Sequence, residues 1–354
     1  MTPTDWLGTR VFITGHTGFK GSWLTVLLHD LGASVHGYSL PELPTTPCLF
    51  DVARLSTRLS SDTRGDVADV QHLRDAVKRA DPQVVFHLAA QPLVPASYAD
   101  PLGTFQTNVM GTACLLEAIR DTNVRAVVIV TTDKVYENRE WVHPYRESDR
   151  LGGHDPYSAS KAAAELITAS YRASFFSSEG SPRVVTARAG NVIGGGDWAL
   201  NRLVPDCLRA FSKGYPVRLR RPAAVRPWQH VLEPLSGYLI LAQRLLGDRP
   251  VSHNAWNFGP NHVDEVNVGK VAQTLADLWG PNARLEHDKS AHSPEASHLS
   301  LDHSLARHEL GWQPRWALRQ GLQATLDWYR QWLAGGDMLQ LCIDQTRAFR
   351  EEHQ

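Results

Sequence analysis

A tyrosine and a lysine four residues apart stand at the start of a predicted helix in the middle of the chain. Tyr157 and Lys161 share one face of that helix, because positions i and i+4 are neighbours on a helical surface. A lysine ammonium beside a phenol favours the phenolate, which brings a group with an ordinary pKa of about 10 closer to a working general base. By itself, however, this pattern is more often a surface tyrosine beside a solvated lysine. Its interpretation depends on what the rest of the chain places around it.

Three glycines near the N-terminus supply a second chemical signal. Gly15, Gly18 and Gly21 follow the apolar run Val11 to Ile13 in a GxxGxxG spacing. The first permits a tight turn, the second lets backbone approach a pyrophosphate, and the third lets the following helix lie close to the strand. The helix N-terminus would then face the anion with unpaired N–H groups. The spacing predicts a dinucleotide site rather than a structural turn, and it does not fit a P-loop, because Lys20 precedes the last glycine.

The elements that must position these groups alternate between strands and helices. This alternation predicts an α/β fold with a parallel, doubly wound sheet of the Rossmann type. The expected strands are Val11 to Ile13, Ser34 to Ser39, Gln83 to Leu88, Ala126 to Val130 and Val184 to Ala189, and the expected helices are Ser22 to Leu31, Asp69 to Ala80, Phe105 to Ile119 and Tyr157 to Phe176.

Ligands of such sheets bind outside the carboxyl ends of the strands. The glycine loop, Ala89-Ala90-Gln91 and Thr132-Asp133-Lys134 each follow a predicted strand, so we expect them to face one crevice. The second strand runs into Tyr38 to Pro41, followed by Glu42. An acidic residue there would bind the adenosine ribose hydroxyl and an arginine would indicate a 2′-phosphate, so this strand end favours NAD.

The composition changes after the segment Gly190 to Trp198, where loops rich in Pro, Arg and Trp begin. Guanidinium groups such as Arg218, Arg220 and Arg221 suit a diphosphate-bearing substrate, although a solvated basic loop is the alternative. We expect two domains. Residues 1–190 with about 230–260 should form the NAD-binding domain, and residues 191–229 and 261–354 a smaller substrate-binding domain. The chain should return to the first domain at His230 to Leu246 and Trp256 to Gly259, and the helices Val266 to Leu278 and Arg315 to Leu333 should close the second.

Charge and composition exclude several classes of protein. The 354 residues carry 36 Lys and Arg against 37 Asp and Glu, so no global field would attract nucleic acid or an anionic membrane. The N-terminus lacks a basic region followed by an apolar one, and no run of about 18 apolar residues occurs. We therefore expect a soluble protein of the cytoplasm.

Cysteine and histidine spacing argue against a metal site. The four cysteines lie far apart with no CxxC or CxxH, which also argues against a disulfide framework. Glu286, His287, His292 and His298 fit no compact metal motif, and we interpret them as part of a polar loop. We expect no bound metal.

Taken together, the glycine loop, Thr132 and YxxxK resemble the extended short-chain dehydrogenase/reductases, and more narrowly the nucleotide-sugar 4,6-dehydratases that act on CDP-glucose. Related dehydratases for dTDP-glucose or GDP-mannose have Asp-Glu where this chain has Asp133-Lys134. One departure is Pro95, where the family usually has Arg. The matching segments are Gly15 to Leu24, Ala89 to Val94, Thr132 to Trp141, Gly152 to Lys161, Arg188 to Trp198 and Arg226 to Leu235.

The resemblance implies a reaction and a role for each catalytic residue. Bound NAD would oxidise the sugar at C4, water would be lost across C5–C6, and the hydride would return to C6, as in deoxysugar and lipopolysaccharide biosynthesis. Tyr157 would be the base for the C4 hydroxyl, Lys161 would hold the nicotinamide ribose and lower the tyrosine pKa, and Thr132 would hydrogen-bond the C4 oxygen. Asp133 and Lys134 would serve the elimination as acid and base.

The resemblance also implies binding residues and an assembly. The substrate would contact Gln91, Asn191, Arg202 and Arg226, with Asn191 and Arg226 on its diphosphate. A homodimer would form through a four-helix contact made by Phe105 to Ile119 and Pro156 to Phe176. The cofactor would contact Gly15, Thr17, Gly18, Phe19, Lys20, Gly21, Asp66, Val67, Ala89, Ala90, Tyr157 and Lys161.

Three other interpretations stay open at this point. An NAD-dependent nucleotide-sugar epimerase or dehydrogenase would need the glycine loop, Thr132, Tyr157 and Lys161, but no acid–base pair at Asp133-Lys134. A dehydratase for a different nucleotide sugar would keep the chemistry and change only the substrate. A non-catalytic protein that senses a dinucleotide is a third possibility, which an intact Thr132, Tyr157 and Lys161 set argues against.

Overall fold

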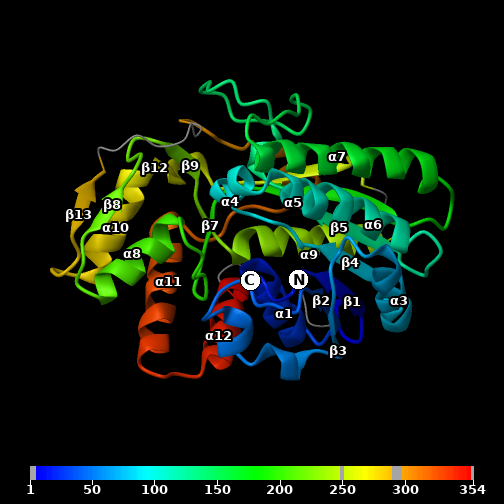
Figure 1. Ribbon diagram of the computed structural model, residues 1–354, viewed down its shortest axis with the longest axis horizontal. Coiled ribbons are helices and arrows are strands. Elements are labelled where there is room, and N and C mark those ends of the chain that lie inside the picture. The colour runs from blue at the N-terminus through cyan, green and yellow to red at the C-terminus, as the bar shows by residue number, and fades with distance from the viewer. Residues whose placement is uncertain (1–4, 248–250, 289–296, 352–354) are drawn as a thin grey trace.

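A parallel sheet of seven strands forms the centre of the protein in the computed structural model, which describes residues 5–247, 251–288 and 297–351 (Figure 1). The strand order is β11-β6-β5-β4-β1-β2-β3, so β1 and β4 flank the point where the order reverses. This confirms the expected doubly wound α/β fold. The strands are β1 (Arg10–Thr14), β2 (Ser34–Ser39), β3 (Ser61–Arg64), β4 (Val84–His87), β5 (Ala126–Val130), β6 (Arg183–Ala189) and β11 (Ala255–Phe258).

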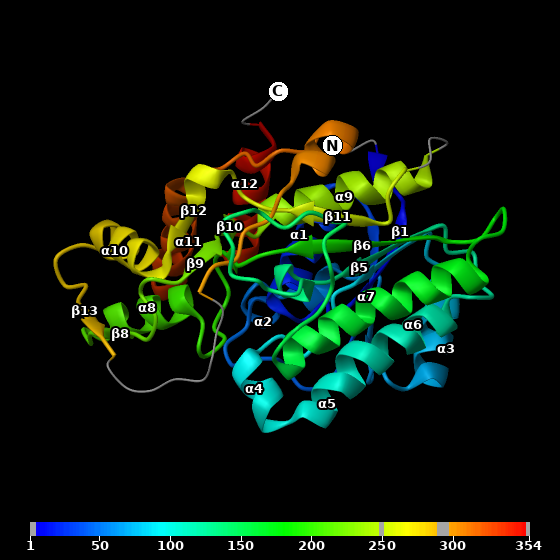
Figure 2. The same cartoon turned by 90° about the horizontal axis from the view of Figure 1, so that it is seen from above.

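Helices cover both faces of the sheet, as Figure 2 shows. Every residue of β4 and β5 is buried, which explains why both strands are continuous apolar runs rather than alternating ones. One face carries α1 (Phe19–Asp30), α9 (Leu232–Leu246) and α12 (Met338–Glu351). The other carries α3 (Val70–Ala80), α4 (Val94–Ala99), α5 (Pro101–Phe105), α6 (Gly111–Ala118) and α7 (Pro156–Phe175).

A second region with its own core lies beside the carboxyl ends of the strands. Its apolar core includes Phe211, Trp228, Leu275 and Leu322. Three helices and short two-stranded sheets enclose this core. They are α8 (Leu203–Ser212), α10 (Val268–Trp279), α11 (Leu318–Leu333), and the pairs β8 (Val217–Leu219) with β13 (Leu285–His287), β9 (Val225–Pro227) with β12 (Glu265–Asn267), and β7 (Val192–Ile193) with β10 (Gln229–His230).

Several elements were not predicted, among them α4 and α8, and three further differences concern the sheet and the helices packed on it. Strand β3 was not expected, because its residues Ser61–Arg64 are all polar and give no apolar periodicity. The helix expected from Phe105 begins instead at Pro101, with Asp100 as its N-cap, and passes through a π-helical turn at Gln106–Met110 before α6. Asp-Pro is a recognised helix start, so the sequence did contain that signal.

The third difference is α12, a helix that was not predicted. It packs on a different part of the molecule from the domain to which its residues were assigned. Residues 261–354 were assigned to the substrate-binding domain, but α12 packs against α1. Its Cys342 and Phe349 belong to the same core as Trp23 and Leu27, and Arg347 Nη2 lies 2.7 Å from Asp30 Oδ1. This helix therefore belongs with the sheet.

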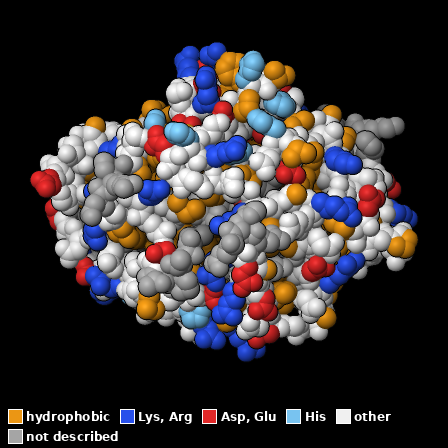
Figure 3. All heavy atoms as spheres, turned by 180° about the vertical axis from the view of Figure 1, so that it is seen from behind, with side chains coloured by type: hydrophobic (Ala, Val, Ile, Leu, Met, Phe, Trp, Pro, Cys, Tyr) orange, Lys and Arg blue, Asp and Glu red, His pale blue; other side chains and the backbone are white. Residues whose placement is uncertain are grey.

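The structure also describes the surface charge, the apolar helices, the cysteines and the possible metal ligands. Figure 3 shows basic and acidic side chains interspersed over the face behind the view of Figure 1. Among the described residues, no helix is long and apolar enough to span a bilayer. The four cysteines are free thiols. Within the same described ranges no cluster of three or more His, Cys, Asp or Glu could hold a metal ion, and His292 lies outside them.

Candidate active site

A cleft of about 730 Å³ lies between the strand ends and the second region, within the size range of ligand pockets. It gathers almost all of the predicted site residues, although they are spread over more than 200 positions in the sequence. Those that line it are Gly15, Thr17, Gly18, Phe19, Lys20, Gly21, Asp66, Val67, Ala89, Ala90, Thr132, Asp133, Lys134, Tyr157, Lys161, Asn191, Arg202 and Arg226.

Gln91 is the exception, and its expected contact with substrate stays a prediction. It is not among the residues that line the cleft. Its side-chain Nε2 donates to Thr104 Oγ1 at 2.9 Å, and its Oε1 accepts from the backbone N–H of Leu93 at 2.6 Å. Both polar atoms of the amide are therefore used to fold the loop between β4 and α4.

The glycine loop has the geometry that a dinucleotide requires. Gly15 has a φ of +76°, and a Cβ there would lie 2.6 Å from the backbone nitrogen of Ala89. A Cβ on Gly21 would lie 2.1 Å from the Gly15 carbonyl oxygen, so α1 can approach β1 only with glycine at this position. Gly18 is the N-cap of α1 and has no side chain to occupy the first N–H groups. These groups can bind the phosphates of a dinucleotide.

His16, which the sequence reasoning missed, connects this loop to the neighbouring strand ends. Its ring is buried, with Nδ1 3.0 Å from Ser39 Oγ and Nε2 3.0 Å from Asp62 Oδ1. Gly37 makes room for it, since a Cβ there would lie 2.5 Å from the ring. A glycine in the middle of a predicted strand often marks a close approach of another group, and this was the available signal. Ser39 and Glu42 line the cleft at the end of β2.

Tyr157 lies in the first turn of α7, where the helix start is well defined. Asp155 caps the helix by accepting from the Ser158 N–H at 2.9 Å, and Pro156 occupies the first turn. Burial raises the pKa of Tyr157 to about 12, while a hydrogen bond with Thr132 lowers it. The phenol is thus protonated at neutral pH in the protein alone.

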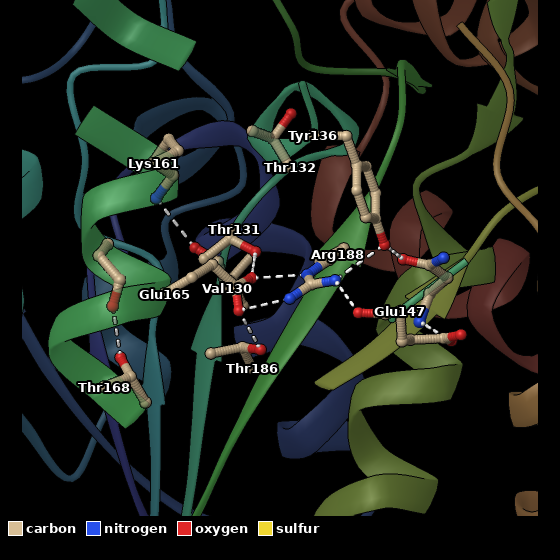
Figure 4. A network of polar contacts seen from close by, with 12 residues as sticks. Val130, Thr131, Thr132, Tyr136, Glu147, Lys161, Glu165, Thr168, Thr186 and Arg188 are labelled. Carbon is tan, nitrogen blue, oxygen red and sulfur yellow. Dashed lines mark hydrogen bonds and ion pairs between the residues drawn. The ribbon is translucent and has the colours of Figure 1, made fainter. Parts of the chain in front are cut away.

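Lys161 lies one turn further along α7 and contacts the sheet rather than solvent. Its Nζ donates to the Val130 carbonyl oxygen at 2.9 Å (Figure 4). Burial lowers the pKa of Lys161 to about 8, and the Glu165 carboxylate opposes that change. The expected lowering of the tyrosine pKa by Lys161 is therefore not the net result here, because the burial of the phenol dominates.

Thr132, Asp133 and Lys134 form a tight turn after β5. Thr132 Oγ1 donates to Asp133 Oδ1 at 2.8 Å and accepts from the Lys134 N–H at 3.4 Å. Asp133 is 2% exposed, and its Oδ2 has no hydrogen-bond partner among the described residues. Burial raises the pKa of Asp133, although the charge of Lys134 opposes it. This carboxyl group can keep a proton and donate it into the cleft.

Lys20 brings a further buried cation into the same space. Burial, together with the charges of Arg202 and Lys161, lowers the pKa of Lys20 to about 7, although the charge of Asp133 opposes this change. The side chain packs beside Tyr238, with Nζ 6.0 Å from the ring centroid. The cleft therefore holds several basic groups that would attract an anionic ligand.

The far end of the cleft is lined by arginines of the second region. Arg202 Nη1 lies 2.9 Å from Asp197 Oδ2, and the buried Arg226 donates through Nη1 to the Val225 carbonyl oxygen at 2.8 Å. Arg218, Arg220 and Arg221 also line this end. Guanidinium groups bind phosphate oxygens through two parallel hydrogen bonds, so this end can hold a diphosphate.

Comparisons with known proteins agree with this geometry. The family model described as GDP-mannose 4,6 dehydratase matches residues 12–325. The CDP-glucose 4,6-dehydratase of Salmonella typhimurium is 48% identical over 339 residues, which cover 94% of this chain and 94% of that protein.

Solved structures resemble the chain over nearly its whole length. MoeE5 in complex with UDP-glucose and NAD aligns with a TM-score of 0.76 and 27% identity, covering 92% of this chain and 99% of that one. The dTDP-glucose 4,6-dehydratase of Bacillus anthracis in complex with NAD aligns with a TM-score of 0.77 over 94% of this chain and 100% of that one. At 22% identity, the latter likeness establishes the fold alone. The chain therefore belongs to the GDP-mannose 4,6-dehydratase family, the nucleotide-sugar dehydratases of the short-chain dehydrogenase/reductase type.

Proposed function

We propose that this protein is an NAD-dependent CDP-glucose 4,6-dehydratase, a hydro-lyase that converts CDP-glucose to CDP-4-dehydro-6-deoxyglucose and water. The observation that carries the proposal is the turn Thr132-Asp133-Lys134, which lies in one cleft with Tyr157 and Lys161. The 48% identity to a CDP-glucose 4,6-dehydratase supports the same substrate. The glycine loop supports a dinucleotide, and the relative with UDP-glucose and NAD supports NAD.

In the proposed oxidation, Tyr157 takes the proton of the C4 hydroxyl while Thr132 holds the C4 oxygen. NAD⁺, when bound, supplies the acceptor for the C4 hydride and the donor that returns it to C6. Lys161 binds the nicotinamide ribose and contributes a positive charge beside the phenol. Since the pKa of Tyr157 is raised to about 12, chiefly by burial, the tyrosine depends on such cationic neighbours to act as a base.

In the proposed elimination, Lys134 and Asp133 act on neighbouring carbons. The C4 ketone acidifies the C5 proton, which Lys134 takes and later returns. Asp133 gives its proton to the C6 hydroxyl, which leaves as water. The raised pKa of Asp133 supports this role, because the acid must be protonated near neutral pH.

The proton balance of the complete reaction is closed inside the site. Tyr157 ends the cycle with one additional proton, and Asp133 ends it with one fewer. Thr132 is hydrogen-bonded to both groups, so its hydroxyl can pass the proton from the phenol back to the carboxylate. The reaction involves no net oxidation.

The two regions of the chain would divide the substrate between them. We assign the NAD-binding part to residues 1–190, about 230–260 and α12, and the nucleotide-sugar-binding part to residues 191–229 and 261–333. Asn191, Arg226 and Arg202 would contact the diphosphate at the second region. The product would serve the synthesis of deoxysugars for lipopolysaccharide. We place the protein in the cytoplasm, where free thiols such as that of Cys48 stay reduced.

Mass spectrometry of the product tests the function directly. The purified protein with NAD⁺ is incubated with CDP-, dTDP- and UDP-glucose and with GDP-mannose. We expect loss of one water from CDP-glucose, and much lower kcat/KM for the others. An unchanged product mass would indicate an epimerase, and equal or faster turnover of dTDP-glucose or GDP-mannose would contradict the proposed substrate.

We further propose a homodimer formed through the segment 101–118 and α7. These helices carry large apolar side chains in solvent, a common sign of an interaction surface. An isologous contact would bury them in a four-helix bundle. The exposed side chains are Leu102, Phe105, Met110, Leu166 and Phe175, of which Leu102 is 81% and Leu166 62% exposed. Light scattering at micromolar concentration checks this, and a monomeric mass would contradict it.

A further inference from the structure

A buried ion pair lies behind the cleft, between the helix that carries Tyr157 and the sheet. Glu165 on α7 and Arg188 on β6 each have side chains 4% exposed, and neither lines the cleft. Arg188 Nε and Nη2 donate to the two carboxylate oxygens of Glu165, each at 2.8 Å. Burying two charges is costly unless their remaining hydrogen bonds are also satisfied, so their other partners are informative.

The partners of Glu165 include the residue that precedes the catalytic turn. Thr131 Oγ1 donates to Glu165 Oε1 at 2.6 Å, and Thr186 Oγ1 donates to Glu165 Oε2 at 2.7 Å (Figure 4). Thr131 is the direct neighbour of Thr132. Glu165 thus fixes the start of the turn to α7, one helical turn beyond Lys161.

The partners of Arg188 include the residue that follows the same turn. Arg188 Nη1 donates to the Tyr136 hydroxyl oxygen at 2.8 Å and to the Glu147 carbonyl oxygen at 3.1 Å. The Tyr136 hydroxyl in turn donates to Asn257 Oδ1 at 2.7 Å, and its ring stacks on that of Tyr145. Arg188 thus fixes the end of the turn to β6.

We infer that the Glu165–Arg188 pair is a positioning clamp, which holds both ends of the segment Thr132–Val135 against the helix that carries Tyr157 and Lys161. The inference rests on the proposed function, since it assigns a purpose to the alignment of those groups. Through the clamp, one ion pair sets the position of the groups for C4 oxidation relative to those for the elimination. The Glu165 carboxylate also raises the pKa of Lys161 against the effect of burial.

Catalytic alignment explains why charged groups occupy this place. For stability alone, apolar side chains of similar volume serve as well as a buried ion pair, and often better. Alignment has a stricter requirement, because a displacement of about 1 Å at reacting groups can reduce a rate by about 10²-fold. Hydrogen bonds of fixed direction to Thr131 and Tyr136 meet that requirement, whereas apolar packing would not.

The test removes the contacts of the clamp without disturbing the ion pair itself. Thr131→Val deletes the hydroxyl that binds Glu165, and Tyr136→Phe deletes the hydroxyl that binds Arg188. Each substitution changes the volume of the side chain very little, so the two single variants and the double variant should fold. Thr131→Ser keeps the hydroxyl and should restore the rate. Thr168→Val is the matched control, because the buried Thr168 lies on α7 and its hydroxyl donates only to the Ala164 carbonyl oxygen of its own helix.

Steady-state and single-turnover rates with CDP-glucose are measured well below the Tm of each variant. We expect kcat to fall by about tenfold in each single variant and by about 10²-fold in the double variant, with KM nearly unchanged. The rate of cofactor reduction in a single turnover should fall in parallel, whereas Thr131→Ser and Thr168→Val should match the wild type.

The outcomes separate the clamp from the function on which it rests. If the wild type and Thr168→Val do not convert CDP-glucose, the proposed function is wrong. If they do, and folded Thr131→Val, Tyr136→Phe and the double variant keep the wild-type kcat and rate of cofactor reduction, the clamp is overturned and the network serves stability only.

Discussion

The two ends of the cleft are built in different ways. At the catalytic end, Thr132, Asp133, Tyr157 and Lys161 are buried and come directly from a strand end and a helix start. At the substrate end, the arginines come from loops and short two-stranded sheets. Arg226 is buried, whereas the others are partly or fully exposed. The catalytic residues, which need fixed distances, are thus held at the ends of regular elements. The anion-binding arginines, which act mainly through their charge, are held by irregular segments.

The largest effect should come from the catalytic end, with Tyr157→Phe. The ring still packs in the cleft, but the proton acceptor for the C4 hydroxyl is gone, so we expect kcat to fall by about 10³–10⁴-fold. Cofactor binding, measured by fluorescence titration, should stay unchanged. Tyr171→Phe, on the same helix but outside the cleft, is the control. A near-normal kcat for Tyr157→Phe would remove Tyr157 from its proposed role.

Lys134→Met separates elimination from oxidation within the catalytic end. The variant keeps most of the stem but loses the amine, so the sugar should still be oxidised while the elimination slows by about 10²–10³-fold. In single turnovers, reduced cofactor should accumulate, visible by its absorbance, and exchange of the C5 proton with D₂O should slow.

Asp133→Asn tests whether the acid and the base of the elimination are separate residues. This variant should also accumulate reduced cofactor but should still exchange the C5 proton, because only protonation of the leaving hydroxyl is impaired. If Lys134→Met formed no reduced cofactor while binding cofactor and substrate normally, the proposed acid–base division would have to be abandoned.

Arg226→Lys tests the substrate end and should have a smaller effect. The charge stays, but the two-pronged donor is lost, so KM for CDP-glucose should rise by about 10–50-fold with little change in kcat. Arg209→Lys, a substitution on α8 at a residue that does not line the cleft, is the control. A large fall in kcat with an unchanged KM would show that Arg226 acts on the chemistry rather than on binding.

The smallest effect should be on stability, through Lys20 at the junction of the two ends. Its pKa is lowered from 10.5 to about 7 in the folded protein, so between these values the unfolded chain binds the additional proton and stability rises with pH. Lys20→Met removes this cost. Its Tm should exceed that of the wild type by about 5 °C at pH 7, and the difference should vanish towards pH 10.5. Melting curves of the two proteins that run parallel from pH 7 to 10 would refute the assignment.

The positions of the catalytic residues could be predicted from the sequence for a physical reason. The position of a residue at a strand end or a helix start is set by that regular element. The apolar runs before Gly15 and Thr132 identify two strands, and this was sufficient to predict that both residues lie at the same edge of the sheet. Lys161 lies on the predicted helix and lines the cleft. Its hydrogen bond to the Val130 carbonyl depends on the packing of this helix against β5, which no local sequence pattern indicates.

Other features depend on contacts distant in sequence. Gln91 follows a strand as expected, yet the chain turns its amide towards Thr104. The polar strand β3 is defined only by its pairing with β2. Arg188 did carry a signal, since a charged residue inside the buried strand Val184 to Ala189 needs a partner, but nothing local identifies Glu165 as that partner.

The packing of α12 on α1 has a consequence for synthesis of the chain. Helix α1 is synthesised long before α12, and Met338, Cys342 and Phe349 cover one of its faces only when α12 has emerged from the ribosome. Arg347 and Arg350 then pair with Asp30, which closes a loop of more than 300 residues. The core around α1 is therefore complete only after α12 has been synthesised, and a chain truncated before Met338 leaves that apolar face of α1 uncovered.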